Sequence, residues 1–117
     1  MPTNICDIQP NTNVDIKARV LMMQPPRTVR SKQGSPLQVA EAILGDSTGR
    51  IPLTLWQKQI YLVKVGNVVE ITSAYASSFQ GITRITLGRT GRLKVIEDPE
   101  FPTLHDLLQE IREEDDD

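Results

Sequence analysis

The sequence predicts an all-β fold: a five-stranded barrel with a short helix between its third and fourth strands, followed by a C-terminal amphipathic, acidic helix. Two observations favour the barrel. Five segments with strand character occur within about 80 residues, and a helical element falls between the third and fourth of them. A third observation separates the tail, because the net charge changes sign near residue 96.

The first strand is predicted over residues 14–22. Apolar side chains occupy its even positions, and the charged Asp15, Lys17 and Arg19 lie at odd positions between them. This alternation is typical of a strand with one face in the core and the other in water. A polar and basic hairpin connection is expected next, over residues 27–34.

The second strand is predicted over residues 37–45, where apolar residues occupy odd and even positions alike, so its faces stay unassigned. The Asp-Ser-Thr-Gly segment at 46–49 favours a turn, because Asp and Ser bond nearby backbone groups and Gly accepts a positive φ. The third strand follows over residues 50–56. Pro52 cannot donate a ladder hydrogen bond, which predicts a strand edge or a bulge there.

The later elements complete a barrel order. They are a short helix over 58–62, a fourth strand over 68–75, a small-residue loop over 76–81, a fifth strand over 82–87 and a basic, glycine-containing exit over 88–92. Five strands with a helix between the third and fourth form the order of an OB-fold. An SH3-like barrel is the main alternative, although it usually lacks that helix.

We expect the barrel domain to cover residues 1–96 and an acidic tail to cover 97–117, with an amphipathic helix at about 103–113. Thr103 is a candidate N-cap for this helix, with Asp106 three residues later. The helix carries one apolar stripe with helical spacing, formed by Leu104, Leu107, Leu108 and Ile111.

Charge divides the chain in the same place. Residues 1–96 contain 12 Lys and Arg against 5 Asp and Glu, a net charge of +7. Residues 97–117 contain one Arg against 10 acidic residues, a net charge of −9. A basic body with an acidic tail is typical of nucleic-acid-binding proteins, and a merely solubilising tail on an ordinary domain is the alternative.

Several classes of function find no support in the sequence. Cys6 is the single cysteine, and His105 is the single histidine and falls in the tail, so neither a disulfide nor a metal-ligand cluster is expected. No phosphate loop or catalytic constellation is present, which predicts a protein that is not an enzyme and needs no cofactor. The lack of a long apolar run or a signal segment predicts a cytoplasmic protein, associated with the nucleoid if it binds DNA.

Trp56 is the most informative side chain, because aromatic residues make up only 4% of the chain. Period-two alternation places Ile51, Leu53 and Leu55 on one face of the third strand and Trp56 on the other, with Arg50. A ring beside a cation on the solvent face is suited to stacking on the bases of single-stranded nucleic acid. A tryptophan covering the barrel mouth is the structural alternative.

Two further rings extend this interpretation. Phe79 falls in a loop of Ser, Gln and Gly, where a core position is not expected. Tyr75 shares its parity with the inward Val69 and Ile71, so it faces outward only if a bulge or a strand end turns it; otherwise it belongs to the core. The remaining aromatics, Tyr61 and Phe101, are expected to pack.

The segments Leu-Gly-Asp-Ser-Thr-Gly-Arg at 44–50, Leu-Thr-Leu-Trp at 53–56 and Tyr-Ala-Ser-Ser-Phe-Gln-Gly at 75–81 resemble a known family. It comprises the single-stranded DNA-binding proteins with one simple OB domain, found in archaea and in eukaryotic DNA-damage-sensing complexes. The resemblance covers roughly residues 3–95. It implies that Trp56, Tyr75 and Phe79 stack on bases, and that the protein protects single strands and recruits partners in replication or repair.

The resemblance has two limits. Some members carry a further aromatic residue on the fifth strand, whereas residues 83–86 contain none. Archaeal members often end in a long Gly/Arg-rich tail, which this chain lacks.

Basic side chains are expected to hold the phosphates, and three to five such contacts predict a slope of log affinity against log salt of about −2 to −3.5. The candidates are Arg27, Arg30, Lys32, Arg50, Lys58, Arg84 and Arg89. Single-stranded RNA is the alternative ligand, and an adaptor subunit whose OB domain binds protein is the alternative function.

The tail leaves three hypotheses open. Its apolar stripe docks into a groove on a partner protein, its acidic end competes with DNA for the basic face, or the helix packs on its own barrel or on a second copy.

Overall fold

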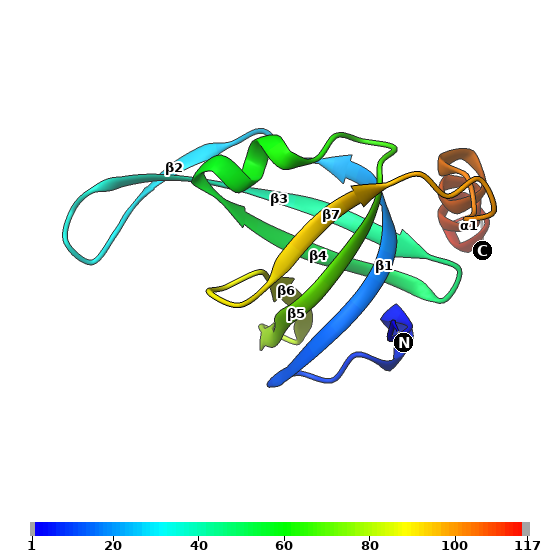
Figure 1. The fold of residues 1–117 in the computed structure, drawn as a ribbon, viewed down its shortest axis with the longest axis horizontal. Coiled ribbons are helices and arrows are strands. Elements are labelled where there is room, and N and C mark those ends of the chain that lie inside the picture. Colours follow the sequence, from blue (N-terminus) through cyan, green and yellow to red (C-terminus); the bar gives the residue numbers. More distant parts are fainter. Residues whose placement is uncertain (1, 116–117) are drawn as a thin grey trace.

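The computed structural model in Figure 1 describes the backbone of residues 2–115 and the side chains of residues 2–109. Over this range the chain forms seven strands, two 3₁₀ helices and one α-helix. The elements in order are η1 (Ile5–Asp7), β1 (Thr12–Met23), β2 (Arg27–Arg30), β3 (Pro36–Asp46), β4 (Gly49–Trp56), η2 (Gln57–Leu62), β5 (Val68–Phe79), β6 (Ile82–Thr86), β7 (Arg92–Ile96) and α1 (Leu104–Asp115).

Five of these strands close the barrel. β1 pairs with β3, β3 with β4 and β5 with β6, all antiparallel, while β4 pairs in parallel with β6. The antiparallel pairing of β5 with β1 closes the ring. These are the five strands predicted from the sequence, and their order is that of an OB-fold barrel, so the predicted fold class is confirmed.

The helical element between the third and fourth barrel strands differs from the expected helix, because η2 is a 3₁₀ helix of six residues. Runs of this length use i→i+3 bonds that tighten the chain without building a regular α-helix. Buried Ile60 and Val63 fix the segment against one end of the barrel.

The core is built from alternate residues of the barrel strands. Ile51, Leu53 and Leu55 are buried as the alternation predicts. The structure also resolves the faces of the second barrel strand, since Ala40, Ala42 and Leu44 of β3 point inward.

Two strands were missed by the sequence analysis. β2 pairs with β3 and extends it into a long hairpin that projects from the barrel in Figure 1. β7 pairs with residues 68–72 of β5, whereas β6 pairs with residues 75–79, so β6 and β7 follow one another along the same edge of β5. The predicted basic exit at 88–92 is therefore a turn that leads into a strand.

Gly91 makes this turn possible. Its N–H donates to the Leu87 carbonyl at 2.8 Å, and a Cβ at position 91 would lie only 2.1 Å from the same oxygen. Because that oxygen is a backbone atom, no side chain at position 91 fits without moving the chain.

The segment between β7 and α1 is held against β1. Lys17 forms an ion pair with Asp98, and Arg19 donates from Nε to the Pro102 carbonyl at 2.8 Å. The Phe101 ring lies near both cations, with its centroid 5.9 Å from Lys17 Nζ and 5.8 Å from Arg19 Cζ. The hydrogen bond from Lys17 lowers the pKa of Asp98 below its usual range, as does the backbone N–H of Glu100.

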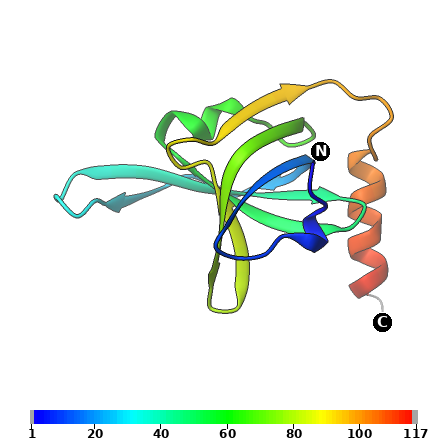
Figure 2. The same ribbon diagram turned by 60° about the horizontal axis from the view of Figure 1, so that its bottom comes forward.

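α1 begins where the sequence predicts, since the Thr103 hydroxyl accepts the Asp106 N–H at 3.1 Å. Figures 1 and 2 place α1 at the end of the barrel opposite the β2–β3 hairpin. Leu107 is fully buried, and its carbonyl accepts a hydrogen bond from Arg50 Nη2 at 2.6 Å. The helix therefore packs on its own barrel, one of the three alternatives for the tail.

This packing corrects part of the expected partner-binding stripe. Leu107 is not available to a partner, because it already lies against the barrel. Leu104 is half-buried and Leu108 is exposed, while the side chain of Ile111 lies outside the described residues. Within the described part of the chain, no helix combines the length and the apolar character needed to cross a membrane.

Candidate nucleic-acid interface

Three aromatic rings are exposed on the outer side of the barrel. Trp56 is 38% exposed, Tyr75 42% and Phe79 60%, although rings of this size usually find burial in a domain of this length. None of the three lies in the barrel interior. Each is placed outward by a different local feature of the chain.

Trp56 points outward because it ends β4, whose alternation continues unbroken to this residue. Its backbone N–H donates to Gln59 Oε1 at 3.0 Å, and the next residue, Gln57, has φ +55°. The Gln57 side chain in turn accepts the Gln38 N–H at 2.9 Å, which ties the end of β4 to β3. The tryptophan therefore sits on a strand end fixed by two glutamine side chains.

Tyr75 points outward because of a β-bulge. In the β1–β5 pairing Val14 opposes Ala74 and Ile16 opposes Ile71, so two residues of β5 oppose the single residue Asp15. The second of them, Ser73, has φ +56°, and its N–H donates to Asp15 Oδ1 at 2.8 Å. Beyond this extra residue the strand parity is reversed, which exposes Tyr75.

Phe79 lies at the end of β5 rather than in the predicted loop, because the strand continues through residues 76–79. It pairs with Ile82 across the two-residue turn of Gln80 and Gly81, whose φ angles are +53° and +80°. Two positive φ angles are typical of the type I′ turn that matches strand twist. The Arg84 guanidinium lies 5.9 Å from the centroid of the Phe79 ring.

Tyr61, which was expected to pack, is instead 71% exposed on η2. Its hydroxyl hydrogen-bonds Gln38 Oε1 at 3.3 Å. It shares no strand with the three outer rings.

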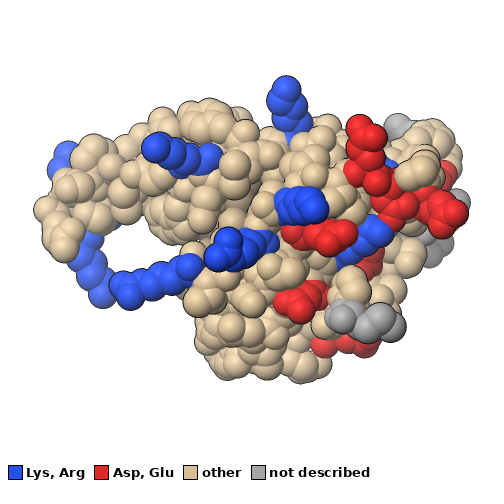
Figure 3. Space-filling view, in the orientation of Figure 1, with Lys and Arg blue, Asp and Glu red and all other residues tan. Residues whose placement is uncertain are grey.

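Cations gather on one face of the molecule. Figure 3 shows Lys and Arg gathered over the projecting hairpin and across the middle of the face, and Asp and Glu gathered toward α1. Five of the predicted phosphate-binding residues are exposed on the hairpin, on η2 and in the β6–β7 turn: Arg27, Arg30, Lys32, Lys58 and Arg89.

The two other predicted cations have partners. Arg84 lies across β4 from Glu41 and forms an ion pair with it at 2.7 Å, with both side chains less than one-third exposed. Arg50 is the second residue of β4, about 20 Å along the strand from Trp56 at ~3.3 Å per residue, and it contacts α1 through the Leu107 carbonyl. The structure therefore brings Arg84 together with the rings and does not bring Arg50 there.

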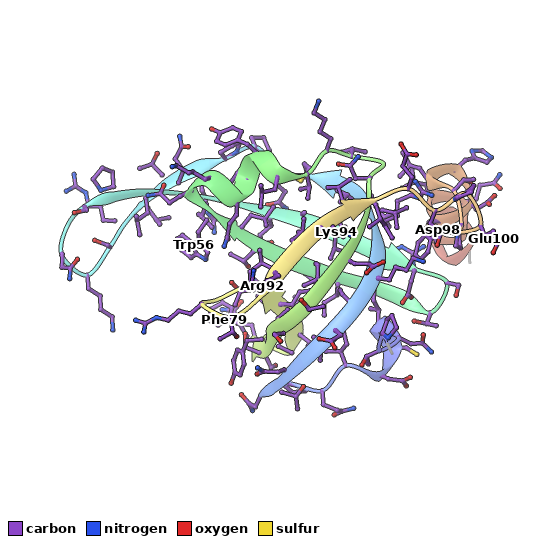
Figure 4. All side chains as sticks on the ribbon, viewed as in Figure 1. Trp56, Phe79, Arg92, Lys94, Asp98 and Glu100 are labelled. Atoms are coloured by element: carbon purple, nitrogen blue, oxygen red, sulfur yellow. The ribbon has the colours of Figure 1, made fainter. Side chains whose placement is uncertain are left out.

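Two cations that the sequence analysis did not select also lie on this side. Arg92 and Lys94 are exposed residues of β7, and Figure 4 shows Arg92 in the same region of the view as Trp56 and Phe79. Their alternation with Leu93 is present in the sequence, but it begins at the last residue of the predicted exit at 88–92 and continues into residues for which no element was predicted. Within the described residues, no cluster of three or more His, Cys, Asp or Glu side chains could hold a metal ion.

An outer face with exposed rings and cations matches the surface that OB-folds use for oligonucleotides. That surface consists of the second and third barrel strands together with the loops joining strands one and two and strands four and five. Here these are β3, β4, the connection containing β2 and the β5–β6 turn. Trp56 and Phe79 lie at the ends of two of these elements.

Residues 9–95 match the family described as "Single-stranded DNA binding protein Ssb-like, OB fold". The single-stranded DNA binding protein Ssb of Saccharolobus solfataricus is 33% identical over 103 residues, which are 87% of this chain and 69% of that protein. Replication factor A of Methanothermobacter thermautotrophicus is 24% identical over 111 residues, which are 92% of this chain and 14% of that protein.

Solved structures give a consistent result. The second OB-fold domain of replication protein A from Methanococcus maripaludis superposes with a TM-score of 0.70 at 27% identity. The match covers 84% of this chain and 97% of that domain.

Proposed function

Since this chain belongs to the Ssb-like family of single-stranded DNA-binding proteins with an OB fold, we propose that it binds single-stranded DNA with little sequence preference. Unpaired bases stack on Trp56, Tyr75 and Phe79, and the surrounding cations hold the phosphates. Such binding protects exposed single strands and supports the recruitment of partners in replication and repair.

The joint exposure of the three rings carries this proposal. Leaving an aromatic side chain in water forgoes about 1.5–3 kcal/mol of burial, so three exposed rings on one functional surface suggest a ligand that covers them. A base that stacks on an aromatic side chain contributes ~1–3 kcal/mol. Three such contacts supply roughly 3–9 kcal/mol if they add, enough for micromolar to nanomolar affinity once ionic contacts contribute.

Phosphate contacts supply the remaining affinity. The exposed cations Arg27, Arg30, Lys32, Lys58 and Arg89 have the freedom to follow a flexible strand, and Arg84 lies beside Phe79. Every base offers a face for stacking, so the proposal predicts weak sequence preference. It also predicts weak binding to duplex DNA, whose bases are already stacked.

A fluorescence titration tests the proposal. Trp56 is the single tryptophan, so adding unlabelled oligo-dT is expected to quench the emission of the wild-type protein. Affinities of the variants are then measured by the anisotropy of a labelled oligo-dT. Trp56→Ala, Tyr75→Ala and Phe79→Ala should each weaken binding by about 5- to 150-fold.

Tyr61→Ala is the comparison variant, because it removes an exposed ring that lies on η2 and on none of the strands that carry the three rings; it should weaken binding less than any of the three ring variants. An absence of binding to oligo-dT would overturn the proposal, as would equal affinity for duplex DNA. Equal losses for Tyr61→Ala and the three ring variants would refute the stacking role. Tighter binding of oligo-U than of oligo-dT would favour RNA as the ligand.

A further inference from the structure

The outer face of β7 carries two adjacent cations that lie outside the surface usually used by OB-folds. Arg92 and Lys94 are exposed, and Leu93 between them turns inward and packs against the core. This alternation follows from the pairing of β7 with β5, in which Thr72 opposes Arg92 and Glu70 opposes Lys94. The two cations therefore project from a fixed strand and not from a mobile loop.

These cations differ from several others in the barrel because they have no ion-pair partner among the described side chains. Lys17 pairs with Asp98 and Arg84 pairs with Glu41. Neither Arg92 nor Lys94 lies within ion-pair distance of a described carboxylate. Both are thus free to bind an anion without first giving up a partner.

A hollow of about 340 Å³ lies between the two cations and β5. Thr72 and Glu70, which are exposed on β5, line the other side of the hollow with a hydroxyl-bearing and a carboxylate-bearing side chain. Its volume falls at the lower end of the range for small-ligand sites, which suits one nucleotide unit. The two cations on its rim would face the phosphates, while Glu70 lowers the positive potential beside Lys94.

The hollow is close to the rings along β5. Thr72 precedes Tyr75 by three residues that include the bulge at Ser73, so the two lie at most about 10 Å apart along the strand at ~3.3 Å per residue. Two to three stacked nucleotides span that distance at ~3.4 Å each. In Figure 3 basic side chains recur from the hairpin to the middle of the face.

The same surface has a defined end. Figure 4 shows Lys94 further along β7 than Arg92, followed by Asp98 and Glu100 in the next segment. Glu100 would repel a phosphate chain that continued past Lys94, whereas the charge of Asp98 is offset by its ion pair with Lys17. A DNA strand that lies along β7 is therefore expected to end its contact where β7 ends.

We propose that Arg92 and Lys94, with the hollow beside them, form a phosphate-binding extension of the single-stranded DNA site, here called the β7 strip. The β7 strip takes up the part of a bound strand that runs beyond the stacking rings. This inference rests on the proposed function, and it assigns to β7 a contact that the five-strand barrel surface does not include.

Oligonucleotide length tests the β7 strip, because a short strand fills the ring positions without reaching β7. The wild type and the double variant Arg92→Gln/Lys94→Gln are titrated with labelled dT5 and dT15 at several salt concentrations. Each variant is compared with the wild type at the same length, so the larger number of registers on dT15 cancels. Two lost phosphate contacts should reduce the salt slope for dT15 by about 1.4 and leave that for dT5 within about 0.3.

Two single variants sharpen the test. Lys64→Gln removes one exposed positive charge outside the strip and measures the effect of net charge alone. Glu70→Gln removes the carboxylate from the hollow and should tighten dT15 binding about two- to fivefold with little effect on dT5.

Equal losses at both lengths, or losses no larger than those of Lys64→Gln when scaled for charge, would overturn the β7 strip while leaving the proposed function in place. A wild-type protein that binds neither oligonucleotide would overturn both.

Discussion

Substitutions at Ser73 test the bulge that turns Tyr75 outward. Ser73 has φ +56°, a conformation that costs an ordinary residue roughly 1–2 kcal/mol. Glycine adopts it without this cost but loses about 0.5–1 kcal/mol of chain entropy on folding. Serine already bears this cost, so Ser73→Gly should raise the free energy of unfolding by up to about 1.5 kcal/mol. Ser73→Val should lower it, because a β-branched side chain tolerates this backbone region less well than serine does.

Ser78 provides the matched control on the same strand. It is exposed and pairs regularly with Thr83, and it has no positive φ. In a regular strand glycine destabilises by about 0.5–1 kcal/mol, and valine is neutral or stabilising by up to about 1 kcal/mol. The two positions should thus respond to the same two substitutions with opposite signs.

Urea unfolding measures the four variants, and oligo-dT binding gives the functional result. Ser73→Gly should keep the wild-type affinity within about twofold, because the N–H that Asp15 accepts is retained. Ser73→Val should weaken binding by up to the value of one stacking contact, about 5- to 150-fold. The bulge does not fix Tyr75 as described if Ser73→Val leaves the free energy of unfolding unchanged. The same holds if Ser73→Gly and Ser78→Gly lower it equally.

Three further perturbations follow from contacts in the structure. Glu41→Gln should release Arg84 and make the salt slope for oligo-dT steeper by about 0.7, as measured by anisotropy, at a stability cost of about 1 kcal/mol. Leu107→Ala should weaken the docking of α1 by about 2–4 kcal/mol, measured by hydrogen exchange of the helix, with oligo-dT affinity unchanged. The pKa of Asp98 is lowered in the folded protein, so the ionised side chain stabilises the fold fully above its unfolded pKa of ~3.9. This stabilisation should be lost as the pH falls through the folded pKa. Asp98→Asn should abolish the corresponding acid-sensitive step in an NMR titration of the tail.

The outcome for each ring shows what local sequence can and cannot predict. The outward position of Trp56 was predictable, because the alternation of β4 continues without interruption to that residue. The position of Tyr75 was not, since it depends on two residues of β5 opposing the single residue Asp15 of β1. The number of residues that face each other at a bulge is set by the register between β1 and β5, which are far apart in the chain. The identities of Ser73 and Asp15 do not reveal that register.

β7 was missed for a related reason. The glycines at 88 and 91 correctly indicated a turn, and turns usually separate elements. The reason why a five-residue strand follows this turn is visible only in the structure, where β7 pairs with an edge of β5 that β6 leaves free. The apolar stripe of α1 was predicted, but a groove on a partner and the barrel itself satisfy the same periodicity, so only the structure could show that Leu107 packs against the barrel.

The basic residues of the barrel domain fall into two groups in the structure. Lys17, Arg19 and Arg50 hold the C-terminal segment at the end of the barrel opposite the hairpin. Seven exposed cations remain on the side that carries the rings or on the elements beside it: Arg27, Arg30, Lys32, Lys58, Arg89, Arg92 and Lys94. At ~0.7 per phosphate they limit the salt slope to about −5, and the slope of −2 to −3.5 corresponds to three to five of them in contact. Release of Arg84 from Glu41 and a contact from Lys64 would extend this limit to about −6. A slope steeper than that would require cations from the α1 end, and hence release of the docked tail when DNA binds.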